Sequence, residues 1–463
     1  MATLFSELPI PAAQLANLTE LGYLEMTPIQ AQALPHILKG KDVLGRAQTG
    51  SGKTAAFGIG LLSKINPELF STQALVLCPT RELADQVSKE LRRLARYMPN
   101  VKILSLCGGQ PIAAQVTSLA HAPHIAVGTP GRILDHLERD SLSLSDTKVV
   151  VLDEGDRMLD MGFADEMDAI IPFLPSPRQT LMFSATYPED IEAISQLIQT
   201  DPLMITIDER SQRLHIEQYM VELEKNQRLE LVAQLLSKHQ PESCVVFCNT
   251  KSDCQKVEAH LNQRNMDALA LHGDLEQRDR DQVLLRFANH SCRVLVATDV
   301  AARGLDIPNL AMVINYELAH DPEIYVHRIG RTGRAGEKGL AVSFVTPAEM
   351  NRALAVEAYM ERPTQWVDKY TFADVKRAQL RAPMATLCID GGKKDKIRAG
   401  DILGALTNGE EALSGDEVGK IDVYPMHVYV AVTRSSADRA IKRIRAGKIK
   451  GKTCRVRVLT ERL

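Results

Sequence analysis

The chain has 463 residues, of which 45% are hydrophobic and 24% charged, a composition that is ordinary for a globular protein. This length fits about three domains, so core size is no constraint, and the net charge of −3 neither favours nor excludes a nucleic-acid partner. The charge is uneven, because residues 381–463 carry 17 Lys and Arg against 10 Asp and Glu, a net of +7, which leaves −10 on the remainder. A basic tail on an acidic body suggests that the tail contacts a polyanion.

The eight cysteines form no paired framework. Cys244 and Cys248 lie four apart on a strand-like run and face the same side, but no further ligands lie nearby, so we expect buried thiols rather than zinc. The chain shows no basic-then-apolar leader and no apolar run near the roughly 18 residues of a membrane helix. We therefore expect a reduced, cytoplasmic protein without a membrane partner.

Two series of short apolar runs follow one another along the chain, each run preceding a helical pattern. They cover residues 74–79, 102–107, 124–130, 149–154 and 180–186, and then 244–250, 269–273, 292–298, 312–318 and 340–346. Continuous rather than alternating apolarity predicts strands covered on both faces, hence parallel sheets flanked by helices. We predict an α/β fold with two such lobes, residues 1–207 and 216–362, with a seam near 205–218.

The segments between the runs support this reading. One predicted helix carries a single apolar stripe of Leu83, Val87, Leu91, Leu94 and Met98. Ser252 and Gln255 stand at capping-box spacing before another. A second boundary lies at 360–384, and beyond it residues 384–463 read as strand, helix, strand, helix, strand. This order predicts a small α+β domain.

The strongest chemical signal is the stretch AQTGSGKT, which fits the phosphate-loop pattern except that Ala47 replaces the first glycine. In such a loop, backbone N–H groups and the following helix cradle phosphates, Lys53 reaches the β and γ oxygens, and Thr54 ligates Mg²⁺. The plain alternative is a turn before a helix. We expect a nucleotide site formed by Ala47, Gln48, Thr49, Gly50, Ser51, Gly52, Lys53 and Thr54.

Three acidic residues end the run VVVLDEGD, and they are expected to act together with the phosphate loop. Asp153 is expected to complete the Mg²⁺ shell through water, and Glu154 to orient and deprotonate the attacking water. For an isolated motif, a solvated acidic strand end would be the better reading. A hydrolase also needs positive charge at the leaving phosphoryl group, which HRIGRTGRAG offers through Arg328, Arg331 and Arg334.

Together these motifs resemble the DEAD-box RNA helicase family. GYLEMTPIQ resembles its adenine-reading segment, PTRELA, GG and TPGR its first-lobe RNA contacts, and SAT its coupling motif. VVFCNT, HGDLEQRDR, ATDVAARGLD and HRIGRTGR resemble its second-lobe series. The resemblance spans about residues 5 to 350 in order and implies RecA-like lobes, ATP and Mg²⁺ as cofactors, and RNA as partner.

The resemblance assigns roles to single residues. Tyr23 would stack on adenine, Gln30 would read its edge, and Asp306 would hold the ribose. Lys53, Asp153 and Glu154 would be catalytic, with Arg331 and Arg334 as arginine fingers. Coupling of nucleotide state to RNA would use Asp156, Ser184, Thr186 and His327. The RNA backbone would be held by Thr80, Arg81, Gly109, Thr129, Arg132, Gly273 and Thr298.

In the tail, the stretches MATLCIDGGKKDKIRAGDILGALT and GKIKGKTCRVRVL resemble the C-terminal domain of the bacterial DbpA subfamily, a variant RNA-recognition fold. This resemblance implies capture of a hairpin of 23S ribosomal RNA and a role in large-subunit assembly, on precursor particles. The first tail strand has no aromatic residue and the HVYVAV strand only Tyr429, so base stacking on the sheet is not expected. We expect RNA contacts from basic loops: Lys393, Lys394, Lys396, Arg398, Lys448, Lys450 and Lys452.

Three hypotheses remain open from the sequence. The first is an ATP-dependent RNA helicase acting on 23S rRNA, expected as a monomer. The second is an RNA-binding clamp or assembly factor whose hydrolysis is impaired by Gly155, since the family has alanine there. The third, a DNA helicase or another phosphate-loop ATPase, is disfavoured by the motifs that resemble RNA-specific relatives. Because no carboxylate is missing, we expect an active ATPase.

Overall fold

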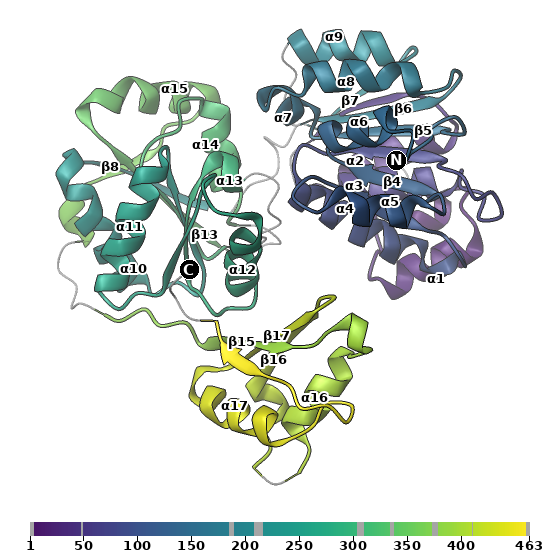
Figure 1. The fold of residues 1–463 in the computed structure, drawn as a ribbon. Helices are drawn as coiled ribbons and strands as arrows, with labels where there is room; N and C mark the ends of the chain where they lie inside the picture. Colours follow the sequence, from purple (N-terminus) through teal and green to yellow (C-terminus); the bar gives the residue numbers. More distant parts are fainter. Residues whose placement is uncertain are drawn as a thin grey trace. The chain divides into compact units, whose positions relative to one another are not determined.

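The computed structural model describes residues 4–47, 50–184, 189–207, 216–302, 310–333, 338–372, 378–409 and 411–459. These residues form two compact units, one on each side of the seam at 208–215 (Figure 1). The first unit is lobe 1, and the second contains lobe 2 and the tail domain. Among the described residues, no helix has the length and apolarity needed to cross a membrane.

Lobe 1 is built on a seven-stranded sheet in which all neighbours pair in parallel, in the order β3-β4-β2-β5-β6-β1-β7. The strands are β1 (Val43–Arg46), β2 (Ala74–Leu77), β3 (Ile103–Leu106), β4 (Ile125–Gly128), β5 (Val149–Asp153), β6 (Gln179–Ser184) and β7 (Leu203–Thr206). Parallel neighbours require a crossover between them, which the helices of the lobe supply.

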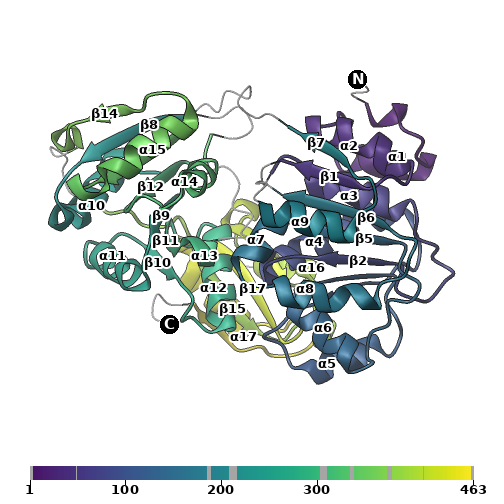
Figure 2. The same ribbon diagram turned by 90° about the horizontal axis from the view of Figure 1, so that it is seen from above.

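Helices cover both faces of this sheet (Figures 1 and 2). They are α1 (Ala12–Glu20), α2 (Pro28–Leu38), α3 (Lys53–Leu62), α4 (Arg81–Leu94), α5 (Ile112–Leu119), α6 (Pro130–Glu138), α7 (Gly155–Asp160), α8 (Ala164–Ile170) and α9 (Glu189–Ile198). Val149 and Val151 of β5 join a core with α2, α3 and α4, whereas Val150 and Leu152 join a core with α6, α8 and α9. Successive strand residues face opposite sides, so this continuously apolar strand is buried on both.

Lobe 2 repeats the topology of lobe 1 strand for strand, again entirely parallel, as β10-β11-β9-β12-β13-β8-β14. Its strands are β8 (Ile216–Glu222), β9 (Cys244–Cys248), β10 (Ala268–Leu271), β11 (Val294–Thr298), β12 (Met312–Asn315), β13 (Gly339–Val345) and β14 (Gln365–Val367). Its helices are α10 (Arg228–His239), α11 (Lys251–Gln263), α12 (Gln277–Ala288), α13 (Asp299–Ala302), α14 (Pro322–Ile329) and α15 (Met350–Met360).

The predicted fold class is confirmed, and the sequence prediction missed several short strands. Strands β1, β7, β8 and β14 were not predicted, and β14 extends lobe 2 beyond the expected end at residue 362. β14 is a three-residue edge strand, too short for a period to show. The expected helix cap at Ser252 is wrong, because the Thr250 hydroxyl accepts the hydrogen bond from the Asp253 N–H at 3.1 Å.

The tail domain is a four-stranded antiparallel sheet with two helices, where the sequence predicted three strands. Its order is β16-β17-β15-β18, and its elements are β15 (Met384–Asp390), α16 (Ala399–Thr407), β16 (Val418–Val423), β17 (His427–Thr433), α17 (Ala437–Ala446) and β18 (Val456–Val458). Leu387, Ile389 and Val430 pack with α16 and α17, so the helices cover one face of the sheet.

The other face of the tail sheet contacts lobe 2 within the second unit. The buried carboxylate of Asp267, just before β10, accepts hydrogen bonds from Arg381 at 3.0 Å, the Ala382 N–H at 2.7 Å and Arg434 at 2.6 Å. Beside it, Asn289 donates to the Thr386 hydroxyl at 2.9 Å. A small apolar cluster of Leu285, Cys388, Tyr429 and Leu459 completes the contact.

We predict that Asp267→Ala loosens the tail domain from lobe 2. The substitution deprives three donors of their shared acceptor, which should destabilise the contact by about 1–3 kcal/mol. Hydrogen exchange of the full chain, followed by mass spectrometry, should show faster exchange in β15. Asp274→Ala, which removes an exposed carboxylate paired with Lys251, is the control. Unchanged protection of β15 in Asp267→Ala would contradict the prediction.

Candidate nucleotide site and RNA interface

The candidate nucleotide residues meet at the carboxyl ends of three adjacent strands of lobe 1. The phosphate loop follows β1, the acidic motif follows β5, and Ser184 ends β6, which lies between them. The parallel register pairs Arg46 with Ser184 and Asp153 with Phe183, so all three strands end at one level of the sheet. Segments about one hundred residues apart in sequence are thus brought to one corner, the usual ligand position in such sheets.

The phosphate loop leads directly into α3. Gly52 adopts a left-handed conformation with φ of +94°, and a Cβ there would lie 2.5 Å from the Gln30 amide nitrogen. Lys53, the first residue of α3, is buried and donates from Nζ to the Ala47 carbonyl at 2.8 Å. Thr54 follows it in the first turn of the helix. Gln48 and Thr49 lie outside the described residues.

The adenine-reading candidates flank this loop. Gln30 accepts a hydrogen bond from the Thr27 N–H at 2.9 Å in a capping box of α2, and its amide donates to the Gly52 carbonyl at 3.1 Å. Tyr23 donates from its hydroxyl to Glu90 at 2.7 Å and packs edge-on against Phe5 with ring centroids 6.1 Å apart. Gln30 therefore connects α2 to the phosphate loop through a hydrogen bond.

Asp153 is the most deeply buried carboxylate of the site. Burial raises its pKa to about 6, and the positive charge of nearby Lys53 opposes this shift. Its Oδ1 is buried and has no hydrogen-bond partner among the described residues. Such an orphaned carboxylate oxygen suits Mg²⁺, which prefers oxygen ligands, and the Thr54 hydroxyl is the other ligand predicted from the sequence.

Glu154 and Asp156 are fixed by neighbouring residues. Glu154 caps α7 in a left-handed conformation with φ of +55°, and its Oε2 accepts a hydrogen bond from the Arg157 guanidinium at 2.7 Å. The Asp156 N–H donates to the Ser184 hydroxyl at 3.2 Å. This bond connects two of the predicted coupling residues, and Thr186, the third in lobe 1, lies outside the described residues.

The first-lobe RNA candidates follow β2, β3 and β4, the three strands beyond β5 in the sheet. Thr80 caps α4, and a Cβ at Gly109, whose φ is +77°, would overlap the Arg81 guanidinium. Thr129 precedes α6, and Arg132 donates to Gln110 and Gln115 across the same edge. We call β5-β6-β1, which carry the nucleotide candidates, the nucleotide half of the sheet, and β3-β4-β2, which carry the RNA candidates, the RNA half.

Lobe 2 carries its candidates on equivalent edges. Gly273 follows β10 and Thr298 ends β11, and these strands are neighbours. His327 lies in the last turn of α14, and Arg331 follows it, 8% exposed. Asp306 and Arg334 lie outside the described residues.

Arg328, grouped with the arginine fingers from sequence, is engaged inside lobe 2. It is 2% exposed and donates to both carboxylate oxygens of Asp299, at 2.6 and 2.7 Å, and to Asn249 at 2.8 Å. Its guanidinium also lies over the Phe247 ring. In the described residues this arginine therefore ties strands of lobe 2 together.

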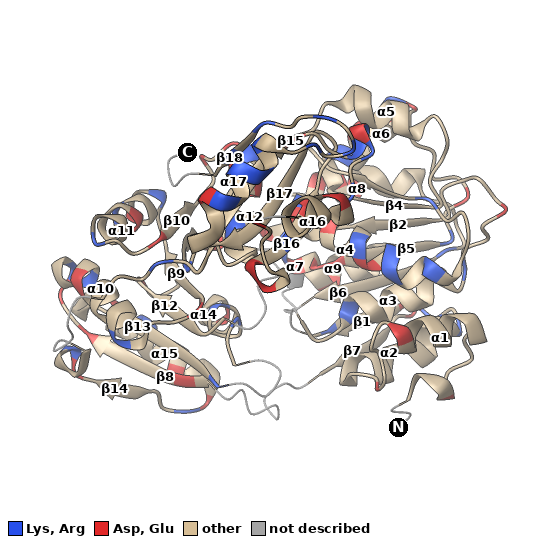
Figure 3. Ribbon diagram, turned by 90° about the horizontal axis from the view of Figure 1, so that it is seen from below, with Lys and Arg blue, Asp and Glu red and all other residues tan. Residues whose placement is uncertain are grey.

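In the tail, the two lysine-bearing segments expected to contact RNA lie against each other. Lys450 donates to the Lys396 carbonyl at 2.6 Å and pairs with Asp401, and Lys452 pairs with Asp395 at 2.9 Å. The remaining candidates of the two segments are exposed: Lys393, Lys394, Arg398 and Lys448. Further basic residues gather on α17 (Figure 3). The structure thus joins separate sequence segments into one basic surface.

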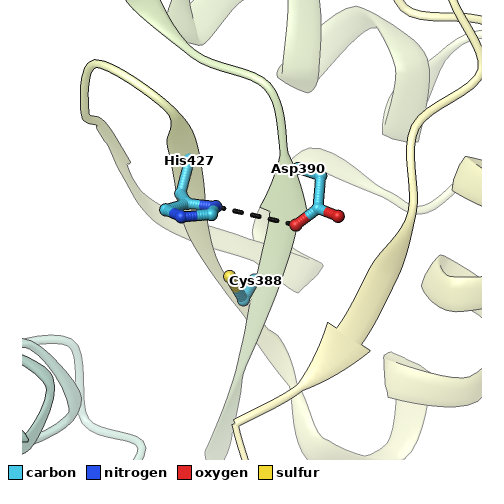
Figure 4. A group of neighbouring side chains, drawn as sticks. All are labelled: Cys388, Asp390 and His427. Atoms are coloured by element: carbon cyan, nitrogen blue, oxygen red, sulfur yellow. Dashed lines mark ion pairs between the residues drawn. The ribbon is translucent and has the colours of Figure 1, made fainter.

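The face of the tail sheet opposite its helices carries Cys388, Asp390 and His427, whose ligand-type atoms lie within 4.8 Å of one another (Figure 4). His427 and Asp390 face each other across β15 and β17, with Nδ1 and Oδ1 3.6 Å apart. Arg457, the partner of Cys388 on β18, donates to the thiol and places a positive charge beside it. This charge opposes metal binding by the cluster.

Sequence reasoning missed two features of these sites. Arg157 gave no signal of its own, because an arginine three residues after Glu154 on a helix is common on solvated surfaces. The contact of Tyr424 with Tyr429, edge-on with centroids 5.4 Å apart, depends on a strand, β16, that was not predicted.

Comparison with known proteins agrees with this arrangement. Residues 27–194 match the DEAD/DEAH box helicase family, residues 227–336 the helicase conserved C-terminal domain, and residues 386–458 the DbpA RNA binding domain. The chain is 61% identical over 458 residues to the ATP-dependent RNA helicase DbpA of Escherichia coli strain K12, covering 99% of this chain and all of that one.

The chain belongs to the DEAD-box ATP-dependent RNA helicases. It is also 44% identical to the DEAD-box helicase CshA of Bacillus anthracis, over 82% of this chain and 72% of that one. A structure of S. cerevisiae Dbp5 bound to RNA and ADP BeF3 is similar with a TM-score of 0.72 and 30% identity, covering 81% of this chain and 97% of that one. This DEAD-box helicase therefore uses ATP and binds RNA.

The departure from the family at Gly155 is accommodated without strain. A Cβ at this position would lie 3.3 Å from Ile191 Cδ1 and 3.7 Å from Met182 Cγ, which are side-chain atoms that can yield slightly. Gly155 is the first residue of α7, and its backbone does not require glycine. The missing methyl removes no functional group.

We predict that Gly155→Ala stabilises lobe 1 slightly, by about 0.5–1 kcal/mol, and raises the RNA-stimulated ATPase rate modestly if at all. Thermal unfolding and steady-state ATPase measure the two effects. Gly162→Ala is the matched contrast, since Gly162 follows α7 with φ of +80° and a side chain there is strained. It should destabilise the lobe. A dead wild-type enzyme revived by the methyl at position 155 would contradict this prediction.

Proposed function

We propose that this helicase unwinds short duplexes of 23S rRNA during assembly of the large ribosomal subunit, after its tail domain captures an rRNA hairpin. The observation that supports the proposal is the combination of complete nucleotide motifs in lobe 1 with a tail domain that matches the DbpA RNA binding domain. We further propose that it acts as a monomer in the cytoplasm, on precursor particles.

The nucleotide corner of lobe 1 accounts for the hydrolysis. Lys53 and the backbone of the loop hold the phosphates, and Glu154 orients and deprotonates the attacking water. Thr54 and Asp153 would hold Mg²⁺, Asp153 through water, and the ion would neutralise phosphate charge when bound. Arg331 and Arg334 supply positive charge to the transition state.

The RNA edges of both lobes account for binding without sequence readout. Small residues and loop N–H groups at strand ends contact the sugar-phosphate backbone, which gives affinity but carries no sequence information directly. Local edges of this kind also explain how a body with net charge −10 outside the tail binds a polyanion. Preference for a particular RNA therefore falls to the tail domain.

The loops of the tail are the proposed contact surface for the rRNA hairpin. The aromatic Tyr429 lies on the face of the sheet opposite the helices, but it is 9% exposed and packs in the cluster with Leu285 of lobe 2. A buried ring cannot stack on a base, whereas the paired basic segments around Lys394 and Lys450 are exposed. Phosphate contact by these lysines would make hairpin binding strongly salt-dependent.

Steady-state ATPase without RNA, with generic RNA and with 23S rRNA tests the proposed target. We predict that 23S rRNA stimulates hydrolysis far more than generic RNA. Deleting residues 384–463 should leave generic stimulation and abolish the preference, because the lobes do not read sequence. If ATP is hydrolysed under none of these conditions, the helicase hypothesis is rejected in favour of an RNA clamp. If the preference for 23S rRNA survives the deletion, the proposed role of the tail is refuted.

We predict that replacing Lys393, Lys394 and Lys448 with alanine weakens binding of the rRNA hairpin at least tenfold at low salt and flattens its salt dependence, since each lysine lost removes up to one released counterion. Fluorescence anisotropy with a labelled hairpin measures both effects. Alanine at Lys39, Lys41 and Lys89, three exposed lysines of lobe 1, removes the same charge as a control. Equal losses in the two variants would show that only net charge matters.

A further inference from the structure

Glu154 stands at a sharply constrained point of lobe 1. It is the single residue between the end of β5 and the start of α7, and its φ of +55° and ψ of +53° are left-handed. The left-handed conformation costs a residue with a side chain roughly 1–2 kcal/mol, so the surrounding structure must hold Glu154 in it. The side chain is nonetheless 3% exposed. Its carboxylate is therefore directed into the lobe, beside Asp153, and needs a partner there.

Arg157 is that partner. Its Nη1 donates to Glu154 Oε2 at 2.7 Å, and the side chains of the two residues are only 7% and 4% exposed. Arg157 is itself fixed by α7, since its N–H donates to the Glu154 carbonyl at 3.1 Å and to Asp156 Oδ1 at 3.0 Å. A charge-assisted hydrogen bond between buried groups is strong and directional.

The Arg157 guanidinium has one hydrogen-bond acceptor among the described residues. Within the described residues, the side chain of Arg157 makes no hydrogen bond or ion pair other than the one to Glu154. By contrast, buried Arg328 in lobe 2 bonds to four different residues and joins several segments. A buried arginine that binds a single carboxylate does not join several segments, so general stabilisation of the fold explains it poorly.

We propose that Arg157 is the positioning residue for Glu154. By anchoring Oε2, it fixes the direction in which the other carboxylate oxygen points, and a general base must lie within hydrogen-bond reach of the water it deprotonates. This inference rests on the role of Glu154 proposed above. In this proposal Arg157 acts only through Glu154.

The test compares Arg157→Gln and Arg157→Lys in the full chain. For Arg157→Gln, kcat with saturating ATP and RNA should fall at least tenfold, while the KM for ATP and the affinity for fluorescent ADP stay within twofold. Arg157→Lys keeps the charge and should recover part of kcat. If Arg157 acts only through Glu154, then Arg157→Gln should have no further effect in a Glu154→Gln background.

A control separates this role from general loss of charge or stability. Arg178 also lies in lobe 1 and donates to the Pro175 and Ile198 carbonyls, away from the acidic motif. Arg178→Gln should leave kcat unchanged. The inference is overturned if kcat of Arg157→Gln stays within twofold of wild type, if ADP affinity falls together with kcat, or if the effects of Glu154→Gln and Arg157→Gln add.

The same experiment distinguishes failure of the inference from failure of the proposed function. Full ATPase in Glu154→Gln alone would reject the role of Glu154 as base and with it the premise. A strongly impaired Glu154→Gln together with a normal Arg157→Gln would keep the proposed chemistry and reject only the positioning role.

Discussion

The parallel pairing of β5, β6 and β1 is the constraint on which the chemistry of this helicase depends. In parallel strands the carboxyl ends lie on one edge, so a loop at residue 47, a carboxylate at 153 and a hydroxyl at 184 become neighbours. Burial of Asp153 follows from the same geometry, because the strand that carries it is covered on both faces. Its orphaned oxygen and raised pKa are consequences of placing a carboxylate at the tip of such a strand.

The same edge also explains how nucleotide and RNA sites can communicate. The RNA half begins at β2, which pairs directly with β5 of the nucleotide half. Within the nucleotide half, short contacts link the segments around the phosphate loop: Asp156 binds Ser184, and Gln30 binds Gly52. A displacement at the phosphates would reach the RNA half through β5 and its partner β2.

Much of this was accessible from sequence, for identifiable reasons. Strands such as β5 are continuously apolar, so both their existence and their parallel pairing could be predicted, and the phosphate loop has a fixed spacing. What escaped had no distinctive sequence pattern. β14 has three residues and no period, the cap at Thr250 competed with a plausible one at Ser252, and the partner of Glu154 was recognisable only once α7 turned Arg157 inward. Burial of Tyr429 against Leu285 was equally invisible.

The identical strand order of the two lobes has an evolutionary consequence. If one ancestral unit was duplicated, β2, β3 and β4 correspond to β9, β10 and β11, and the proposed RNA residues then correspond as well. Gly109 matches Gly273, and Thr129 matches Thr298. Thr80 matches Thr250, which likewise caps the helix after its strand but is not among the proposed RNA residues. The nucleotide half shows no such symmetry, since β8 in lobe 2 is not followed by a phosphate loop. Such a duplication would have kept the proposed RNA positions in both lobes, where each set could contact a repeating sugar-phosphate backbone, and the phosphate loop in lobe 1 alone.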